Sequence, residues 1–186
     1  MELTEIARDV ADVLKQFDSE KPVHKAFKAG IGPFGEPQLV KTLADRLNGL
    51  GKYCTQTRRT PDLIVNSEWF IEFKIVRPFG DNGEVAENWS VNMLHPYAGN
   101  TSLIGDAIKL IALDSNFRKA LFLIGYEHQP PKISLSPLIS SFELILTQVI
   151  RLKIGRRVEE IRTNLVHPEH QVVRCLGWEL YPDSNL

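Results

Sequence analysis

The sequence has little cysteine, no long apolar run and no excess of either charge, and each shortage excludes a class of protein. Only Cys54 and Cys175 occur. The N-terminal MELTEIARDVADVLKQF has neither the basic start nor the unbroken apolar core of a secretory signal, so we expect two reduced thiols in a cytoplasmic protein. The longest uncharged apolar runs, at 120–125 and 144–150, are too short to span a membrane. The formal net charge of −1 excludes a polycation, so any contact with nucleic acid must come from a local basic face.

What the sequence does contain is typical of one folded domain. Apolar residues make up 43% and charged residues 24% of the chain, the proportions of a soluble globular protein. A chain of 186 residues is long enough for one sizeable core and too short for two ordinary domains. We therefore expect residues 1–186 to form a single domain.

Apolar periodicity and turn residues predict a mixed succession of helices and strands. Pro37 suits the first turn of the second helix, and the glycines of NGLG at 48–51 end it. The predicted helices cover about 3–17, 36–47, 102–113 and 137–153, the last of which can extend to Thr163 past a break at Gly155; the predicted strands cover about 52–58, 62–65, 69–76, 119–127 and 171–180. This order indicates a mixed sheet covered by helices, in an α/β or α+β fold, with a long functional or covering loop at 77–100.

The hairpin predicted from TPDLIVNSEWFIEFKIV, residues 60–76, gathers charges on one face of the sheet. Side chains alternate along a strand, so Glu72 and Lys74 share one face of the strand at 69–76. Pairing with the strand that starts at Asp62 brings this third charge near Glu72. Two carboxylates and an ammonium group therefore meet on a surface flanked by apolar side chains.

Such a cluster calls for a cation, because two close carboxylates raise each other's pKa and a divalent ion reverses that effect. Oxygen ligands without histidine or thiolate favour Mg²⁺ or Mn²⁺ over zinc. An ion of this kind activates water for attack on a phosphodiester. Lys74 is placed to orient that water or to offset phosphate charge, and we expect burial to lower its pKa toward a base role.

These residues resemble the signature of the PD-(D/E)XK nucleases, the restriction-endonuclease-like superfamily: Pro61-Asp62, nine further residues, then Glu72-Phe73-Lys74. The core of that family, in the order helix, three strands, helix and strand, would correspond to about residues 36–127. Residues 1–35, a helix and a connection, and residues 128–186, a helix and a last strand, would be additions. The resemblance implies that Asp62 and Glu72 ligate the metal together with the backbone carbonyl of Phe73, and that Lys74 is the catalytic lysine.

Many members of the family also carry a glutamate on the first core helix that reaches the metal directly or through water, and Glu36 is the candidate here. Positions 36, 40, 43 and 47 fall on one helical face, so Glu36 is expected at the sheet-facing end of that stripe. The predicted catalytic set is Glu36, Asp62, Glu72 and Lys74. The alternative is an ordinary solvent-facing ion pair on a strand, or a degenerate relative without activity.

Two groups of cations are candidates for nucleic-acid contact. Arg58 and Arg59 precede the proposed site directly and Arg77 follows it. The second group lies in RLKIGRR at 151–157 and consists of Arg151, Lys153, Arg156 and Arg157. Glu159 and Glu160 follow at once, so the alternative for this second group is the solvated end of a helix.

Other polar residues are given structural interpretations. Ser102, Asp106 and Lys109 form a narrow strip on one helix, which we interpret as its solvent-facing side rather than a contact with the site. We expect the HxxH pair in the segment 167–170 to be a surface turn, since no further residues with zinc-ligand spacing accompany it. His95 and Tyr97 either touch substrate or anchor the long loop.

Together these features predict a Mg²⁺- or Mn²⁺-dependent nuclease acting on nucleic acid, and specifically a DNA endonuclease of the restriction or repair type. By the resemblance, such a chain works as a homodimer or as a subunit of a larger complex, with the amphipathic N-terminal helix as one dimer surface. Two other classes stay open. One is a catalytically silent interaction or regulatory module on the same fold, and the other is a nuclease directed at RNA.

Overall fold

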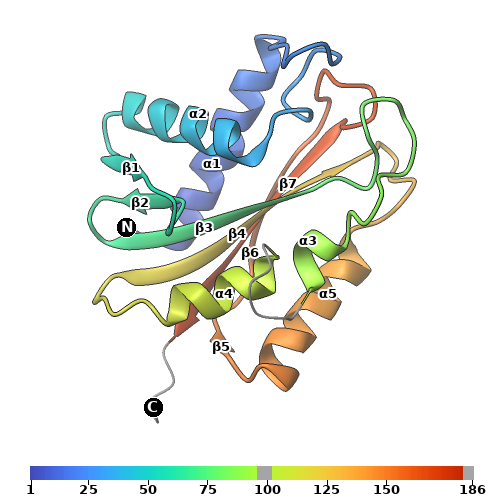
Figure 1. Ribbon diagram of the computed structural model, residues 1–186. Helices are drawn as coiled ribbons and strands as arrows, with labels where there is room; N and C mark the ends of the chain where they lie inside the picture. Colours follow the sequence, from blue (N-terminus) through green and yellow to red (C-terminus); the bar gives the residue numbers. More distant parts are fainter. Residues whose placement is uncertain (96–101, 182–186) are drawn as a thin grey trace.

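The computed structural model describes residues 1–95 and 102–181 (Figure 1). Tyr97 lies outside the described residues. Cys54 is exposed and Cys175 is buried, and neither is in a disulfide. Among the described helices, none has the length and apolar character needed to cross a membrane.

Helices and strands alternate in a mixed α+β order. The helices are α1 (Leu3–Ser19), α2 (Glu36–Gly49), α3 (Val91–Leu94), α4 (Leu103–Ile111) and α5 (Ser136–Leu144), the last continued by a π-helical turn η1 (Ile145–Val149); the strands are β1 (Thr55–Thr57), β2 (Leu63–Val65), β3 (Trp69–Val76), β4 (Arg118–Glu127), β5 (Lys153–Ile154), β6 (Val158–Arg162) and β7 (Val172–Tyr181). The predicted strand at 69–76 is confirmed to the residue, and the other predicted strands agree to within a few residues at their ends.

The strands form one mixed, open sheet in the order β1-β2-β3-β4-β7, with β5 and β6 both paired to β7. β3 and β4 run parallel and are joined by the crossover that contains α3 and α4. The other pairs of described strands are antiparallel. The predicted hairpin between β2 and β3 is confirmed, with Leu63 opposite Ile71 and Val65 opposite Trp69.

Helices cover both faces of the sheet, α1 and α2 on one and α3, α4 and α5 on the other (Figure 1). The alternation of β3 divides its side chains between the two cores. Trp69, Ile71 and Phe73 pack with α1 and α2. Val76 packs with α4 and α5. Glu72 and Lys74 lie on the same face as Val76 and therefore toward α4.

The apolar stripe of α1 is buried within the molecule rather than presented to a partner. Ile6, Val10 and Leu14 are at most 1% exposed and belong to the core that α2 and the sheet complete. This stripe is therefore covered by the chain's own core, and the expectation that α1 forms a dimer surface stays a prediction for its exposed side.

The C-terminal third differs from its prediction. The last helix ends at Val149 instead of continuing through 151–163, because Arg151 takes a left-handed conformation with φ of 62° and so breaks the helical path. The residues beyond it form β5 and β6, which pair with the outer side of β7. Strand pairing available only in the folded chain has overridden local helix preference here.

The predicted turn at 167–170 is present, with the N–H of His170 donating to the carbonyl of His167 at 3.2 Å, but the expectation that its histidines lie at the surface is wrong. His167 is fully buried and His170 is 2% exposed. His167 Nε2 lies 2.9 Å from Asp81 Oδ1, and His170 Nε2 donates to the carbonyl of Phe79 at 2.9 Å. Both imidazoles can be buried because polar groups of the segment after β3 form hydrogen bonds with them.

Candidate active site

The predicted site residues gather at an open edge of β3. β2 pairs with β3 only as far as Leu63 opposite Ile71, so the second half of β3 has no neighbour on that side among the described strands. Two carboxylates take the place of the missing strand. The N–H of Phe73 donates to Asp62 Oδ2 at 2.8 Å, and the N–H of Ile75 donates to Glu36 Oε2 at 3.2 Å. The N–H groups of β3 that have no neighbouring strand therefore hold both carboxylates at the edge.

Lys74 connects the two helical layers at this edge. Its Nζ lies 3.2 Å from Glu36 Oε1, at the start of α2, and 2.9 Å from Asp106 Oδ2, in the first turn of α4. Lys74 and Asp106 are each 7% exposed. The ammonium group is thus held between carboxylates that come from opposite faces of the sheet.

Asp106 is a site residue that the sequence interpretation missed. The Oγ of Ser102 caps α4 by accepting from the N–H of Gly105 at 3.1 Å, and the first turn then faces the sheet. Ser102 is 2% exposed and only Lys109 of the predicted strip is exposed, so the solvent-facing interpretation is wrong for Ser102 and Asp106. The signal was present, since a charge on an otherwise apolar helix next to a charged strand favours contact between the two.

A recess of about 380 Å³ joins these groups, and it is lined by Glu36, Arg59, Thr60, Asp62, Glu72, Lys74, Asp106 and Lys109. All four residues of the predicted catalytic set therefore line one concave surface. They come from three elements: the start of α2, the residue before β2, and β3.

The carboxyl groups of the recess are strongly perturbed. Burial, together with the charge of Asp62 and a hydrogen bond to it, raises the pKa of Glu72 to about 9. Burial also raises the pKa of Asp62, although the N–H of Phe73 opposes the rise. Burial raises the pKa of Glu36 in turn, against the lowering effect of Lys74. Burial and the neighbouring carboxylate of Asp62 therefore both favour the protonated form of Glu72.

The pKa of Lys74 shifts in the direction opposite to the one expected. Burial opposes its charge, but Glu36 and Asp106 together raise its pKa above the ordinary value. The expectation that burial lowers this pKa toward a base role is therefore wrong. Lys74 is an ammonium group, suited to offset negative charge rather than to accept a proton.

The donor set fits a hard divalent cation once Glu72 loses its proton. In the described part of the chain no three or more His, Cys, Asp or Glu side chains already converge as a metal cage. Yet Asp62 and Glu72 offer only oxygen, and their raised pKa values report a need for positive charge between them. In an extended strand the N–H and C=O of one residue point to the same side, so the carbonyl of Phe73 also faces the open edge.

The arginines nearest in sequence have different positions. Arg58 and Arg59 are exposed, and Arg59 lines the recess. Arg77 instead donates from Nη2 to the carbonyl of Phe34, and burial lowers its pKa. It therefore holds the segment that leads into Glu36, and it lines a smaller hollow together with Glu36 and Lys74.

The second group of predicted nucleic-acid contacts is not brought to the recess. Residues 151–157 lie along the far edge of the sheet, where β5 and β6 pair with β7, and β4 stands between β7 and β3. Arg151, Lys153 and Arg156 are exposed there. Arg157 lies 3.2 Å from Glu143 and 3.7 Å from Glu159.

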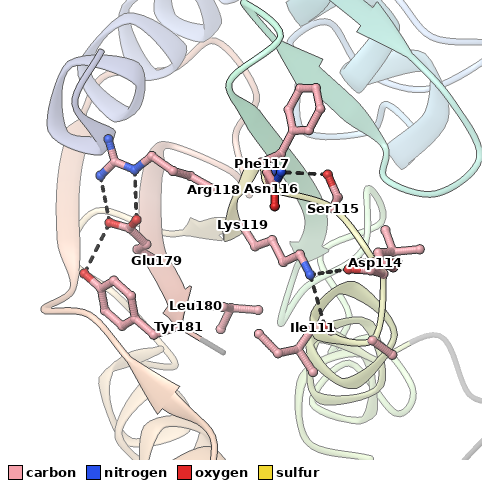
Figure 2. A pocket seen from close by; sticks show the side chains of 12 residues that line it. Ile111, Asp114, Ser115, Asn116, Phe117, Arg118, Lys119, Glu179, Leu180 and Tyr181 are labelled. Carbon is pink, nitrogen blue, oxygen red and sulfur yellow. Dashed lines mark hydrogen bonds and ion pairs between the residues drawn. The ribbon is translucent and has the colours of Figure 1, made fainter. Parts of the chain in front are cut away.

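A larger pocket, of about 610 Å³, shares none of the residues that line the recess and lies beside the C-terminal end of α4 (Figure 2). Its two cations are already engaged. Arg118 donates to both carboxylate oxygens of Glu179 at 2.9 Å, and Lys119 donates to the carbonyl groups of Ile111 and Leu113. Among the described residues that line this pocket, no cation is left uncommitted to bind an anionic ligand.

Comparison of the chain with protein-family models, with curated proteins and with solved structures finds no match.

Proposed function

We propose that this chain is a metal-dependent nuclease that hydrolyses phosphodiester bonds, and specifically a DNA endonuclease of the restriction or repair type. The observation that supports it is the meeting of Glu36, Asp62, Glu72 and Lys74 in one recess, after the sequence pattern had singled out the same four residues. An ordinary surface ion pair would not bury Glu72 and Lys74 to 5% and 7% exposure beside two further carboxylates.

Each side chain has a definite part in this proposal. Asp62, Glu72 and the carbonyl of Phe73 would hold Mg²⁺ or Mn²⁺, with Glu36 close by, and the bound ion would supply charge stabilisation and activation of water. Lys74 carries the positive charge that meets the scissile phosphate. Asp106 is a positioning residue, since it holds the Lys74 ammonium group on the side away from Glu36.

The test is a cleavage assay on supercoiled plasmid, linear single-stranded DNA and RNA, in Mg²⁺, in Mn²⁺ and in chelator. We expect cleavage of DNA only with the metal ions, and a loss of about 100-fold or more in Asp62→Asn and in Lys74→Met. Matched controls are Asp45→Asn, on the exposed side of α2, and Lys132→Met, whose side chain is 59% exposed. Both should cleave at the wild-type rate.

The outcomes separate the competing functions. Cleavage in chelator, or undiminished cleavage in both site variants, contradicts the proposed site. Cleavage of RNA alone assigns the chain to RNA. Absence of cleavage together with absence of Mg²⁺ binding by calorimetry assigns it to the silent module. Linear plasmid as the first product supports a homodimer or larger complex that cuts both strands, and nicked plasmid supports a single site.

A further inference from the structure

A second hollow, which we call the side groove, lies next to the recess. It has a volume of about 400 Å³ and lies between the first turns of α2 and the segment that connects β1 to β2. It shares Glu36, Arg59 and Asp62 with the recess and adds Lys41 and Arg58. A chain-like ligand with one group in the recess would therefore continue into the side groove.

The cations of the side groove are uncommitted. The side chains of Lys41, Arg58 and Arg59 are exposed, and within residues 1–95 and 102–181 none of them takes part in a hydrogen bond or an ion pair. Arg46, five residues further along α2 than Lys41, contrasts with them because it lies 2.6 Å from Glu20. Three unpaired cations in one groove repel each other and attract an anion of matching spacing.

The chemistry of the lining favours phosphates over bases. None of the described residues that line the side groove is aromatic, so it has no platform on which a base would stack. It also contains no Asn or Gln that would read a base edge. Lysine and arginine heads on an open wall are the groups that contact backbone phosphates without regard to sequence.

We propose that the side groove binds the backbone phosphates of the nucleic-acid strand next to the scissile bond, through Lys41, Arg58 and Arg59, and does so without reading the bases. The nature of the polymer rests on the proposed function. Sequence preference, if the enzyme has any, is then set by other surfaces.

The experiment measures binding apart from cleavage. Fluorescently labelled single strands of two unrelated sequences are titrated in Ca²⁺ over a range of salt concentrations, with their integrity checked on denaturing gels. The test variant is the double substitution Lys41→Gln and Arg58→Gln. Its control is Arg8→Gln with Lys25→Gln, which removes the same charges from exposed positions outside the groove.

We expect the test variant to weaken binding of both sequences by about tenfold, and the slope of log K against log salt to become shallower by about 0.7 for each lost phosphate contact. The control should bind as wild type does. A third pair, Lys153→Gln with Arg156→Gln, examines the far edge of the sheet and should also bind normally.

Three results would overturn the inference. They are wild-type protein that binds neither strand, a test variant with unchanged affinity and salt slope, or a loss that appears in the far-edge pair instead. Binding lost in the test variant while wild type never cleaves would contradict the nuclease and leave the groove in place. Normal cleavage by wild type with unchanged binding in the test variant would support the nuclease and contradict the role of the side groove.

Discussion

Lys74 keeps its charge although burial lowers its pKa, because Glu36 and Asp106 approach it from the two sides of the sheet and raise that pKa. A buried cation of this kind is oriented as well as charged, since each carboxylate limits where the ammonium group can lie. Its two partners are not equivalent. Glu36 is bound to the edge of β3 through the N–H of Ile75, whereas Asp106 depends on how α4 docks.

Asp106→Asn should therefore impair catalysis without preventing substrate binding. The amide keeps the shape of the side chain but withdraws the negative charge that holds Lys74 on the α4 side. We expect kcat to fall by about 10- to 100-fold with KM nearly unchanged, and Asp106→Glu to restore part of the loss. Asp114→Asn, at an exposed position just beyond α4, is the control. A rise in KM with unchanged kcat would show that Asp106 binds substrate instead.

Glu72 illustrates how a functional residue can lower stability. In the folded protein its pKa is raised to about 9, against an ordinary value near 4.5, so the unfolded chain releases this proton first as pH rises. The contribution of Glu72 to stability is fully present below about pH 4.5 and is lost progressively as pH rises toward 9.

Glu72→Gln should consequently be more stable than wild type in chelator, by an amount that grows with pH. The amide imitates the protonated acid and does not titrate. We expect nearly equal unfolding free energies at pH 4.5 and an advantage for the variant of up to about 5 kcal/mol at pH 8, at about 1.4 kcal/mol for each pKa unit. Urea titrations at several pH values measure this difference. A constant difference across that range would contradict the raised pKa.

At the scale of elements, the parts of the site that the sequence predicts are those fixed by local geometry. Strand alternation puts Glu72 and Lys74 on one face, the short turn returns Asp62 to that strand, and helical spacing directs Glu36 to the sheet. The role of Asp106 could not be predicted, because the direction in which a polar strip on α4 faces depends on how the helix packs on the sheet. Local sequence patterns do not determine that packing. β5 and β6 could not be predicted for a related reason, since they form by pairing with the outer side of β7, which is far from them in the sequence.

α1 yields a prediction about an element. Leu14 is 1% exposed in the core shared with α2 and the sheet, so Leu14→Ala should lower the unfolding free energy by about 2–4 kcal/mol. The oligomeric state measured by analytical ultracentrifugation should not change. Arg8→Ala, on the exposed side of the same helix, should leave stability within about 0.5 kcal/mol of wild type. A change in oligomeric state would indicate that α1 is an interface between copies.

At the scale of the whole molecule, buried polar contacts join segments that are far apart in the chain. The carboxylate of Asp18, at the end of α1, accepts from the N–H of Ile31 at 3.1 Å and from that of Val166 at 2.7 Å. His170 reaches the segment after β3 through the carbonyl of Phe79. These contacts join the connection before α2 to the segment before β7. Because Glu36 directly follows that connection, they help to fix where Glu36 lies.

His170 makes this network sensitive to acid. Burial, joined by the nearby charges of His167, Arg77 and His128, lowers its pKa to about 4 from about 6.5, while the hydrogen bond to Phe79 acts in the other direction. The unfolded chain takes up the proton first as pH falls. Stability from the neutral imidazole is present above about pH 6.5 and is lost as pH falls toward 4.

His170→Gln should flatten that loss. The glutamine amide can still donate to the carbonyl of Phe79 and does not titrate, so the variant should be less stable than wild type at pH 7, where the ring also packs on Tyr126. Wild type should lose about 2–3 kcal/mol of this advantage between pH 7 and pH 4.5, at about 1.4 kcal/mol for each pKa unit. Urea unfolding of both proteins isolates the effect, because Glu72 contributes equally to each. His24→Gln is the control, and a parallel decline of wild type and His170→Gln would show that another group carries the acid sensitivity.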